Sequence, residues 1–275
     1  DADVKALVEA MLADAEGYKK FRVGEYEPYM TTATVRNNLK TNSLYNNYEN
    51  PTGIYLKPGE SCIIAVSGIG DYPVGLKIKD WYKSGDLSTY KLHNGLNYIT
   101  ATTEGNVFVD YYTDDFKNAP NVQMHFINAP VLGYWDQATM TNADWVSMLA
   151  GPLTEDDEVI IITRSEHAQT AYPVKQWKTY CSANVNETMT YYQQVQWAER
   201  DIMGLKMFGR QVKNRQLFYA DKSGSMYAGG DASVCGYGDL RVLVTPDAKV
   251  FDFWGIGHEW GHNNQMDGFH WSGCG

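Results

Sequence analysis

The residues most able to carry out chemistry lie near the end of the chain, in the sequence His258-Glu259-Trp260-Gly261-His262. In a helix, two histidines four residues apart lie on one face, close enough to bind a single metal ion. Imidazole nitrogen is a common zinc ligand, and a catalytic zinc keeps one position open for water. Glu259 can take a proton from such a water as general base, while the zinc lowers the water's pKa. The spacing therefore predicts a catalytic Zn²⁺ site with His258 and His262 as metal ligands and Glu259 as the catalytic residue.

The residues around this HExxH sequence favour a buried functional helix over an ordinary solvent-exposed one. Gly255, Gly257 and Gly261 each cost about 1 kcal/mol of helix stability relative to alanine. Glycine is tolerated where another backbone or a ligand approaches closely. The apolar segment 250–254 would bury the helix against the rest of the protein. The alternative, two unrelated histidines on a surface helix, does not account for these neighbours.

The segment 254–265, WGIGHEWGHNNQ, resembles the metal-binding helix of the enhancin-like metallopeptidases. These are gluzincins that include viral enhancins and bacterial mucin-degrading proteases. Gln265 and residues 271–273 match the middle of the family pattern, and residues 51–60 are similar to the start of its conserved region. The resemblance implies a zinc endopeptidase that acts on O-glycosylated, mucin-type host proteins. It also implies glycan contacts and a secreted, cell-surface or periplasmic location.

The family pattern continues to a glutamate that is the third zinc ligand, and no Glu follows Glu259 in this sequence. We therefore expect the 275-residue chain to stop short of that ligand, to bind zinc weakly and to be inactive. Asp267 and His270 are the first candidates for a third ligand if the chain itself binds zinc tightly. The metzincin pattern does not fit, because it needs a histidine at position 268, which is glycine.

The bulk composition is that of an ordinary globular protein, with 44% hydrophobic and 20% charged residues, which argues against disorder. The formal net charge of -10 disfavours nucleic acid and anionic membranes as partners, because both need a basic surface. No apolar run approaches the roughly 18 residues of a transmembrane segment. Cys62, Cys181, Cys235 and Cys274 are too widely spaced for a cysteine zinc ribbon, while disulfides and buried thiols both remain open.

Patterning along the chain predicts an α+β protein in three parts. Residues 1–50 form an N-terminal helical and linker segment, with a helix over about residues 2–20. Residues 51–130 contain short alternating strands separated by turns, which is typical of a β-sandwich domain. Residues 131–275 form a gluzincin-type catalytic domain, in which a mixed sheet precedes the HExxH helix and the C-terminus is incomplete.

Finer elements of the third part follow from local periodicity and composition. Residues 142–149 and 188–207 are predicted helices. Residues 159–163 are predicted to form a buried strand, because they are a continuous run rich in β-branched residues. The glycine-rich residues 223–230 are predicted to form an irregular loop. Residues 241–244 are predicted to form a last strand before the HExxH helix.

The sequence leaves other functions open. One is a glycan- or mucin-binding module in which the β-sandwich binds and the incomplete metal site is idle. Another is a zinc hydrolase that acts on a non-peptide amide, which HExxH alone does not exclude. Glu166 and His167 could belong to a further site, but they lack metal-ligand spacing and fit a structural loop better. Zinc binding together with cleavage of casein or mucin would separate the peptidase from the binding module.

Overall fold

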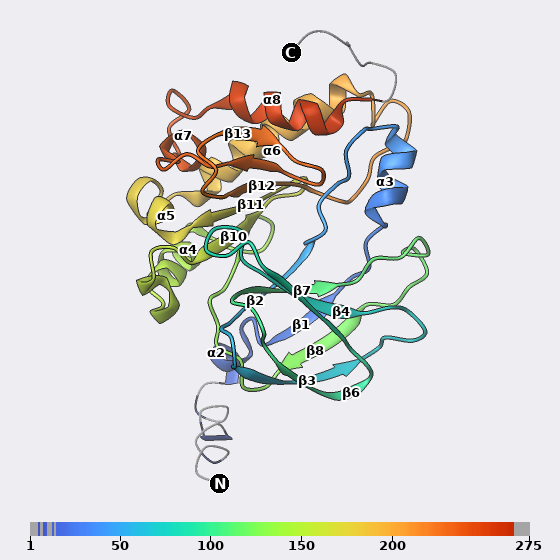
Figure 1. Ribbon diagram of the computed structural model, residues 1–275, viewed down its shortest axis with the longest axis vertical. Coiled ribbons are helices and arrows are strands. Elements are labelled where there is room, and N and C mark those ends of the chain that lie inside the picture. Colours follow the sequence, from blue (N-terminus) through green and yellow to red (C-terminus); the bar gives the residue numbers. More distant parts are fainter. Residues whose placement is uncertain (1–4, 6–7, 10–12, 14, 267–275) are drawn as a thin grey trace.

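The chain folds as a mixed α+β protein in which a six-stranded sheet lies between a β-sandwich and a layer of helices (Figure 1). This computed structural model describes residues 5, 8–9, 13 and 15–266. The predicted α+β fold class is confirmed. Of the predicted N-terminal helix, the structure describes α2 (Ala15–Lys19) and a few helical residues before it.

The β-sandwich consists of two antiparallel four-stranded sheets, with strand orders β1-β8-β3-β6 and β2-β7-β4-β5. Its strands are β1 (Val23–Tyr26), β2 (Asn50–Leu56), β3 (Ser61–Ser67), β4 (Gly75–Lys79), β5 (Leu87–Lys91), β6 (Gly95–Thr100), β7 (Gly105–Asp110) and β8 (Val122–Phe126). Cys62, Ile64 and Val66 of β3 point into the core between the sheets, because side chains alternate along a strand.

Strand β1 joins the sandwich from outside its predicted range. It pairs with β8 along its whole length, from Val23 opposite His125 to Tyr26 opposite Val122. A strand from the predicted segment 1–50 is therefore part of the sandwich. The division of the chain into three independent domains stays a prediction.

Outside the sandwich lies a six-stranded mixed sheet, called the second sheet below, with strand order β13-β14-β12-β11-β10-β9. Its strands are β9 (Trp135–Asp136), β10 (Ile160–Arg164), β11 (Ala168–Pro173), β12 (Gln216–Ala220), β13 (Met226–Ala228) and β14 (Ser233–Cys235). Ile160, Ile161 and Ile162 are all buried, because β10 is covered on both faces. This matches the continuous apolar run from which a buried strand was predicted.

The sandwich covers one face of the second sheet through an apolar cluster. Trp81 and Phe108 of the sandwich layer pack in this cluster with Ile160 and Ile162 of β10 and Leu217 of β12. Side chains of alternate residues on the same strands point to the opposite face, where helices cover them. The second sheet is therefore fixed between two layers, and the helices that it supports have a rigid base.

The helical layer carries the HExxH sequence. Its members are α4 (Asn142–Leu149), η1 (Pro152–Glu155), α5 (Val174–Tyr180), α6 (Val185–Ile202), α7 (Arg241–Val244) and α8 (Phe253–Asn264). Helix α3 (Thr32–Leu39) precedes the sandwich strands β2 to β8. Trp177, Tyr192 and Trp260 are fully buried in the core between this layer and the sheet. Helices α6 and α8 lie side by side, which brings α6 next to the predicted metal ligands.

Two short segments differ from their sequence predictions. Residues 241–244 form helix α7 instead of a strand, and the Asp239 side chain accepts a hydrogen bond from the Arg241 amide at its start. Such a turn favours a helical start over an extended one. Within the predicted loop 223–230, Met226–Ala228 forms β13, because it pairs antiparallel with β14. Segments of three or four residues are too short for periodicity to distinguish helix from strand.

The described cysteines are buried free thiols rather than disulfides. Burial raises the pKa of Cys62 to about 12, and it raises the pKa of Cys181 and Cys235 to about 11. These thiols are therefore protonated near neutral pH and poorly reactive. Cys274 lies outside the described residues.

Candidate active site

Helix α8 presents one buried side and one exposed side. It begins where the Asp252 side chain accepts a hydrogen bond of 2.8 Å from the Gly255 amide, an N-cap that satisfies a free helix donor. Ile256 and Trp260 are fully buried, and the Trp260 ring lies 5.9 Å from the ring of Phe218 on β12. A buried stripe at this spacing leaves the opposite side of α8 facing outwards.

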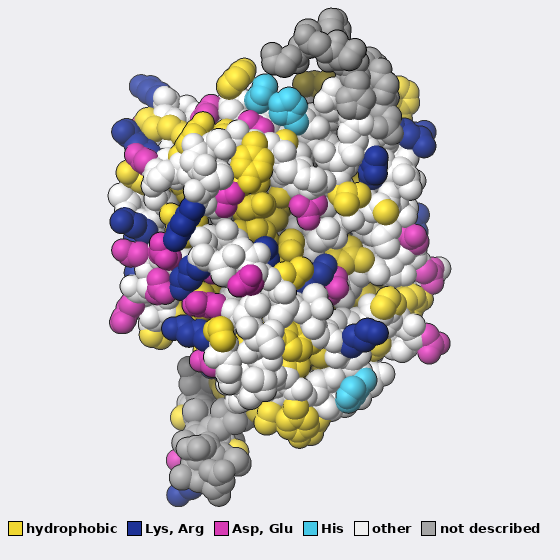
Figure 2. Space-filling view, viewed as in Figure 1, with side chains coloured by type: hydrophobic (Ala, Val, Ile, Leu, Met, Phe, Trp, Pro, Cys, Tyr) yellow, Lys and Arg dark blue, Asp and Glu magenta, His cyan; other side chains and the backbone are white. Residues whose placement is uncertain are grey.

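His258 and His262 lie one turn apart on the exposed side of α8. Their Nε2 atoms are 3.1 Å apart and their ring centroids 4.6 Å apart, so the two nitrogens converge. The Trp254 ring stacks on His258 with a centroid distance of 4.9 Å and an interplanar angle of 22°, which limits rotation of that imidazole. Figure 2 shows histidine side chains together on the surface where Figure 1 places α8. Two imidazoles arranged in this way can share one metal ion.

Glu259 is 8% exposed, in contrast to the histidines on either side of it. The pKa of the Cys235 thiol on β14 is raised mainly by burial and to a smaller extent by nearby carboxylates that include Glu259. Glu259 is therefore more enclosed than the two imidazoles that flank it. Within the part of the chain that the structure describes, its carboxylate makes no hydrogen bond.

A cavity of about 520 Å³ lies beside the two imidazoles, between α6 and α8. His258 and His262 line it from α8, and Glu199 lines it from α6, together with Met203 at the end of that helix. The predicted metal ligands therefore face a space that can admit a small ligand or a peptide side chain.

Glu199 was not identified from the sequence. A Cβ atom added to Gly257 or Gly261 would lie 3.8 or 3.7 Å from Glu199 Oε1, so the carboxylate lies across the glycine face of α8. Burial raises the pKa of Glu199, and a hydrogen bond from Asn264 acts in the opposite direction. The glycine spacing indicated a close neighbour here, but which side chain fills that place depends on how α6 packs.

The donor set fits zinc as far as the described residues supply it. A catalytic zinc takes three protein ligands and a water molecule, and imidazole nitrogen is a preferred ligand type. Residues 15–266 and the few described before them contain no group of three His, Cys, Asp or Glu side chains that could hold one ion. Asp267 and His270, the candidates from the sequence, lie outside the described residues.

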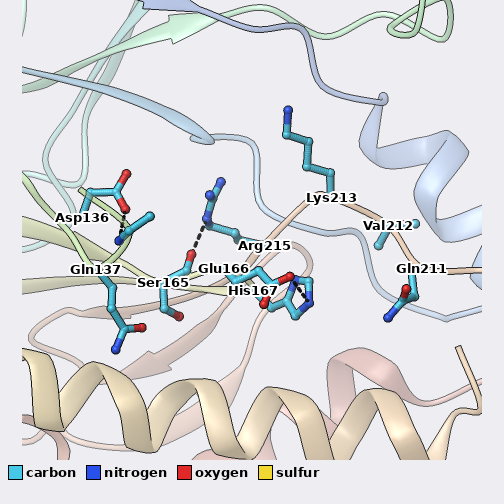
Figure 3. A pocket seen from close by; sticks show the side chains of 10 residues that line it. Asp136, Gln137, Ser165, Glu166, His167, Gln211, Val212, Lys213 and Arg215 are labelled. Carbon is cyan, nitrogen blue, oxygen red and sulfur yellow. Dashed lines mark hydrogen bonds and ion pairs between the residues drawn. The ribbon is translucent and has the colours of Figure 1, made fainter. Parts of the chain in front are cut away.

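Glu166 and His167 lie at a separate cavity of about 620 Å³, at the edge of the second sheet where β10 ends and β12 begins (Figure 3). Burial, with the nearby Arg200 and Arg215 cations, lowers the pKa of His167 to about 3. The Arg215 guanidinium on the same wall is paired with the buried Glu49 carboxylate at 3.0 Å. The imidazole is therefore neutral and enclosed, and its position agrees with a structural loop.

A family model described as peptidase M60, enhancin and enhancin-like, matches residues 128–275. The chain belongs to this family, which confirms the resemblance seen at residues 254–265. The matched region contains the second sheet, the helical layer and α8. No curated protein matches the chain.

Solved structures share the fold over most of this chain. A metallopeptidase from Bacteroides thetaiotaomicron has a TM-score of 0.80 at 22% identity, over 93% of this chain and 45% of its own. A metallopeptidase in complex with Tn antigen has a TM-score of 0.79 at 23% identity, over 90% and 48%. The M60 catalytic domain of Clostridium perfringens ZmpC, in complex with the sialyl T antigen, has a TM-score of 0.75 at 16% identity, over 91% and 54%. The chain thus spans about half the length of these proteins.

Proposed function

We propose that this protein is a zinc-dependent endopeptidase in which His258 and His262 bind the metal and Glu259 is the catalytic base. The observation that carries the proposal is the convergence of the two Nε2 atoms, 3.1 Å apart, beside a cavity in a chain of the M60 family. The third metal ligand would come from outside the described residues, where the family pattern has a glutamate.

When bound, zinc would polarise the scissile carbonyl and lower the pKa of a water molecule. The Nε2 atoms of His258 and His262 would hold the ion, and the stacked Trp254 ring restricts the orientation of His258. The Glu259 carboxylate accepts a proton from the attacking water and passes it to the leaving amine nitrogen. The described residues donate no hydrogen bond to this carboxylate, so the transfer breaks none.

The proposed substrates are O-glycosylated, mucin-type proteins outside the cell. Support comes from two solved structures of the same fold, one in complex with Tn antigen and one in complex with the sialyl T antigen. Contacts to substrate glycans and a secreted or surface location belong to the same proposal. Among the described helices, none is long and apolar enough to cross a membrane.

The test compares cleavage of one peptide with and without a single O-linked GalNAc, by zinc-loaded and chelator-stripped protein. It is run with the 275 residues and with a longer chain that includes the glutamate of the family pattern. We expect zinc-dependent cleavage by the longer chain, with preference for the glycosylated peptide. Binding of that peptide by both chains without any cleavage would support a glycan-binding module instead.

A further inference from the structure

The last turn of α8 is held by a buried polar network centred on Asn264. This residue is 5% exposed and lies two positions after His262. Its Oδ1 accepts hydrogen bonds from the Tyr45 hydroxyl and from Gln216 Nε2, each 2.9 Å long. Its Nδ2 donates to Glu199 Oε2 at 3.1 Å and to Gln216 Oε1 at 3.3 Å. Both donors and both acceptor positions of the amide are therefore in use.

The partners of Asn264 come from three separate parts of the chain. Tyr45 precedes β2, Gln216 begins β12, and Glu199 belongs to the last turn of α6. The backbone adds a further contact, because the Asn42 amide donates to the Gln265 carbonyl at 2.9 Å. The end of α8 is thus connected at once to the sheet, to α6 and to the N-terminal segment.

Glu199 links this network to the cavity beside the two imidazoles. One carboxylate oxygen accepts the hydrogen bond from Asn264, and the other lies against the glycine face of α8 at Gly257 and Gly261. Because these glycines carry no side chain, the Glu199 carboxylate lies directly against the backbone of α8. It is therefore in contact with the turn of α8 that carries His262.

We propose that Asn264 is a positioning residue for the metal site. Together with Glu199 it sets the last turn of α8 so that the His262 Nε2 atom faces the His258 Nε2 atom. The expected effect on metal affinity rests on the proposed function. Removing partners that orient metal ligands typically weakens metal binding by about 10–100-fold.

The experiment uses Asn264→Asp, alone and combined with Glu199→Gln. The first change keeps the side-chain size but removes both donated hydrogen bonds and places a second carboxylate beside Glu199. The second change returns an amide donor to the pair and removes the repulsion. Thr154→Val is the matched control, because it removes buried hydrogen bonds of 2.7 Å to the Leu149 and Gly151 carbonyls, away from α8.

Two readouts are needed: the zinc affinity of the longer chain, by competition titration well below the unfolding temperature, and amide hydrogen exchange along α8 in zinc-free protein. We expect Asn264→Asp to weaken zinc binding by about 10–100-fold and to speed exchange in the last turn of α8 more than in the first. The double variant should recover most of both effects. Thr154→Val should lower the melting temperature and change neither readout.

Unchanged zinc affinity and unchanged exchange in Asn264→Asp would overturn the proposal. If the unaltered longer chain bound no zinc, the proposed function would fail, and the exchange comparison would still decide the positioning role. If Asn264→Asp does not fold, Tyr45→Phe removes one hydrogen bond of the same network at smaller cost. It should change both readouts in the same direction by a few-fold, and no change in either would overturn the proposal.

Discussion

Helix α8 and the loop before β11 place the same side chain in opposite environments. His258 and His262 are exposed, their Nε2 atoms converge at 3.1 Å, and within the described residues the two imidazoles hydrogen-bond only each other. His167 is buried beside Glu166, and burial with two nearby arginines lowers its pKa to about 3. A carboxylate neighbour is thus a poor sign of a metal site. Accessible, convergent nitrogen lone pairs are a better one.

The largest difference between the two regions should appear when a histidine is removed. In the longer chain, His258→Ala or His262→Ala should each abolish tight zinc binding, because each removes a protein ligand. The loss should exceed the roughly 10–100-fold typical of changes to surrounding residues. His167→Gln should leave zinc affinity within about two-fold of the unaltered protein, given the limited reach of a change outside the ligand shell. Metal analysis and titration check this, and stoichiometric zinc in either alanine variant would refute the site.

The next effect separates catalysis from metal binding within α8. Glu259→Gln removes the proposed base but keeps both imidazoles. Turnover should fall by roughly 10²–10⁴-fold, the usual contribution of a general base, while zinc affinity stays unchanged. Steady-state kinetics on the glycosylated peptide, with zinc content measured in parallel, are the test. Turnover at the unaltered rate would mean that another group accepts the proton.

A third effect concerns how the free energy of unfolding depends on pH, and it involves only the buried His167. The folded-state pKa of His167, about 3, lies below the ordinary value of 6.5, so the unfolded chain binds this proton more readily. The contribution to stability is full above pH 6.5 and is lost as the pH falls towards 3, by an amount on the order of 5 kcal/mol. His167→Gln should flatten this part of the stability curve. Denaturant unfolding between pH 4 and 7 measures it, and equal slopes in both proteins would contradict the assignment.

The smallest effect tests the stacking that orients one ligand. Trp254→Ala removes the ring packed on His258 and should weaken zinc binding by a few-fold, since an aromatic pair contributes about 0.5–1.5 kcal/mol. Tyr98→Ala, another exposed aromatic residue but on the sandwich, is the control. Equal zinc affinity in both variants would show that Trp254 does not orient the imidazole.

The sequence correctly predicted those helices and strands that are determined by their own local pattern. The helix at residues 142–149 coincides with α4, and the β-branched run at 159–163 overlaps β10, because both signals are contained in the segments themselves. It failed at residues 241–244, where the start of a turn outweighed a strand-like run of four residues. It also placed β1 outside the sandwich, since four residues with little apolar alternation carry almost no strand signal.

The residues of the candidate site also fall into those that the sequence could predict and those that it could not. The spacing of His258 and His262 depends only on the helical repeat, so the pair could be proposed from the sequence. Glu199 and Asn264 could not, because their contact depends on how α6 and α8 pack in the folded protein. The metal-binding roles themselves remain predictions that await titration.

The apolar cluster between the sandwich and the second sheet also bears on the order in which the chain folds. Trp81 and Phe108 are synthesised before Ile160, Ile162 and Leu217, which they cover. All the sandwich strands are complete at Phe126, and domains generally fold in order as they leave the ribosome. If the sandwich folds as an independent domain, the most apolar strands of the second sheet emerge beside a surface that is already formed. Their inner face would then be shielded from neighbouring nascent chains.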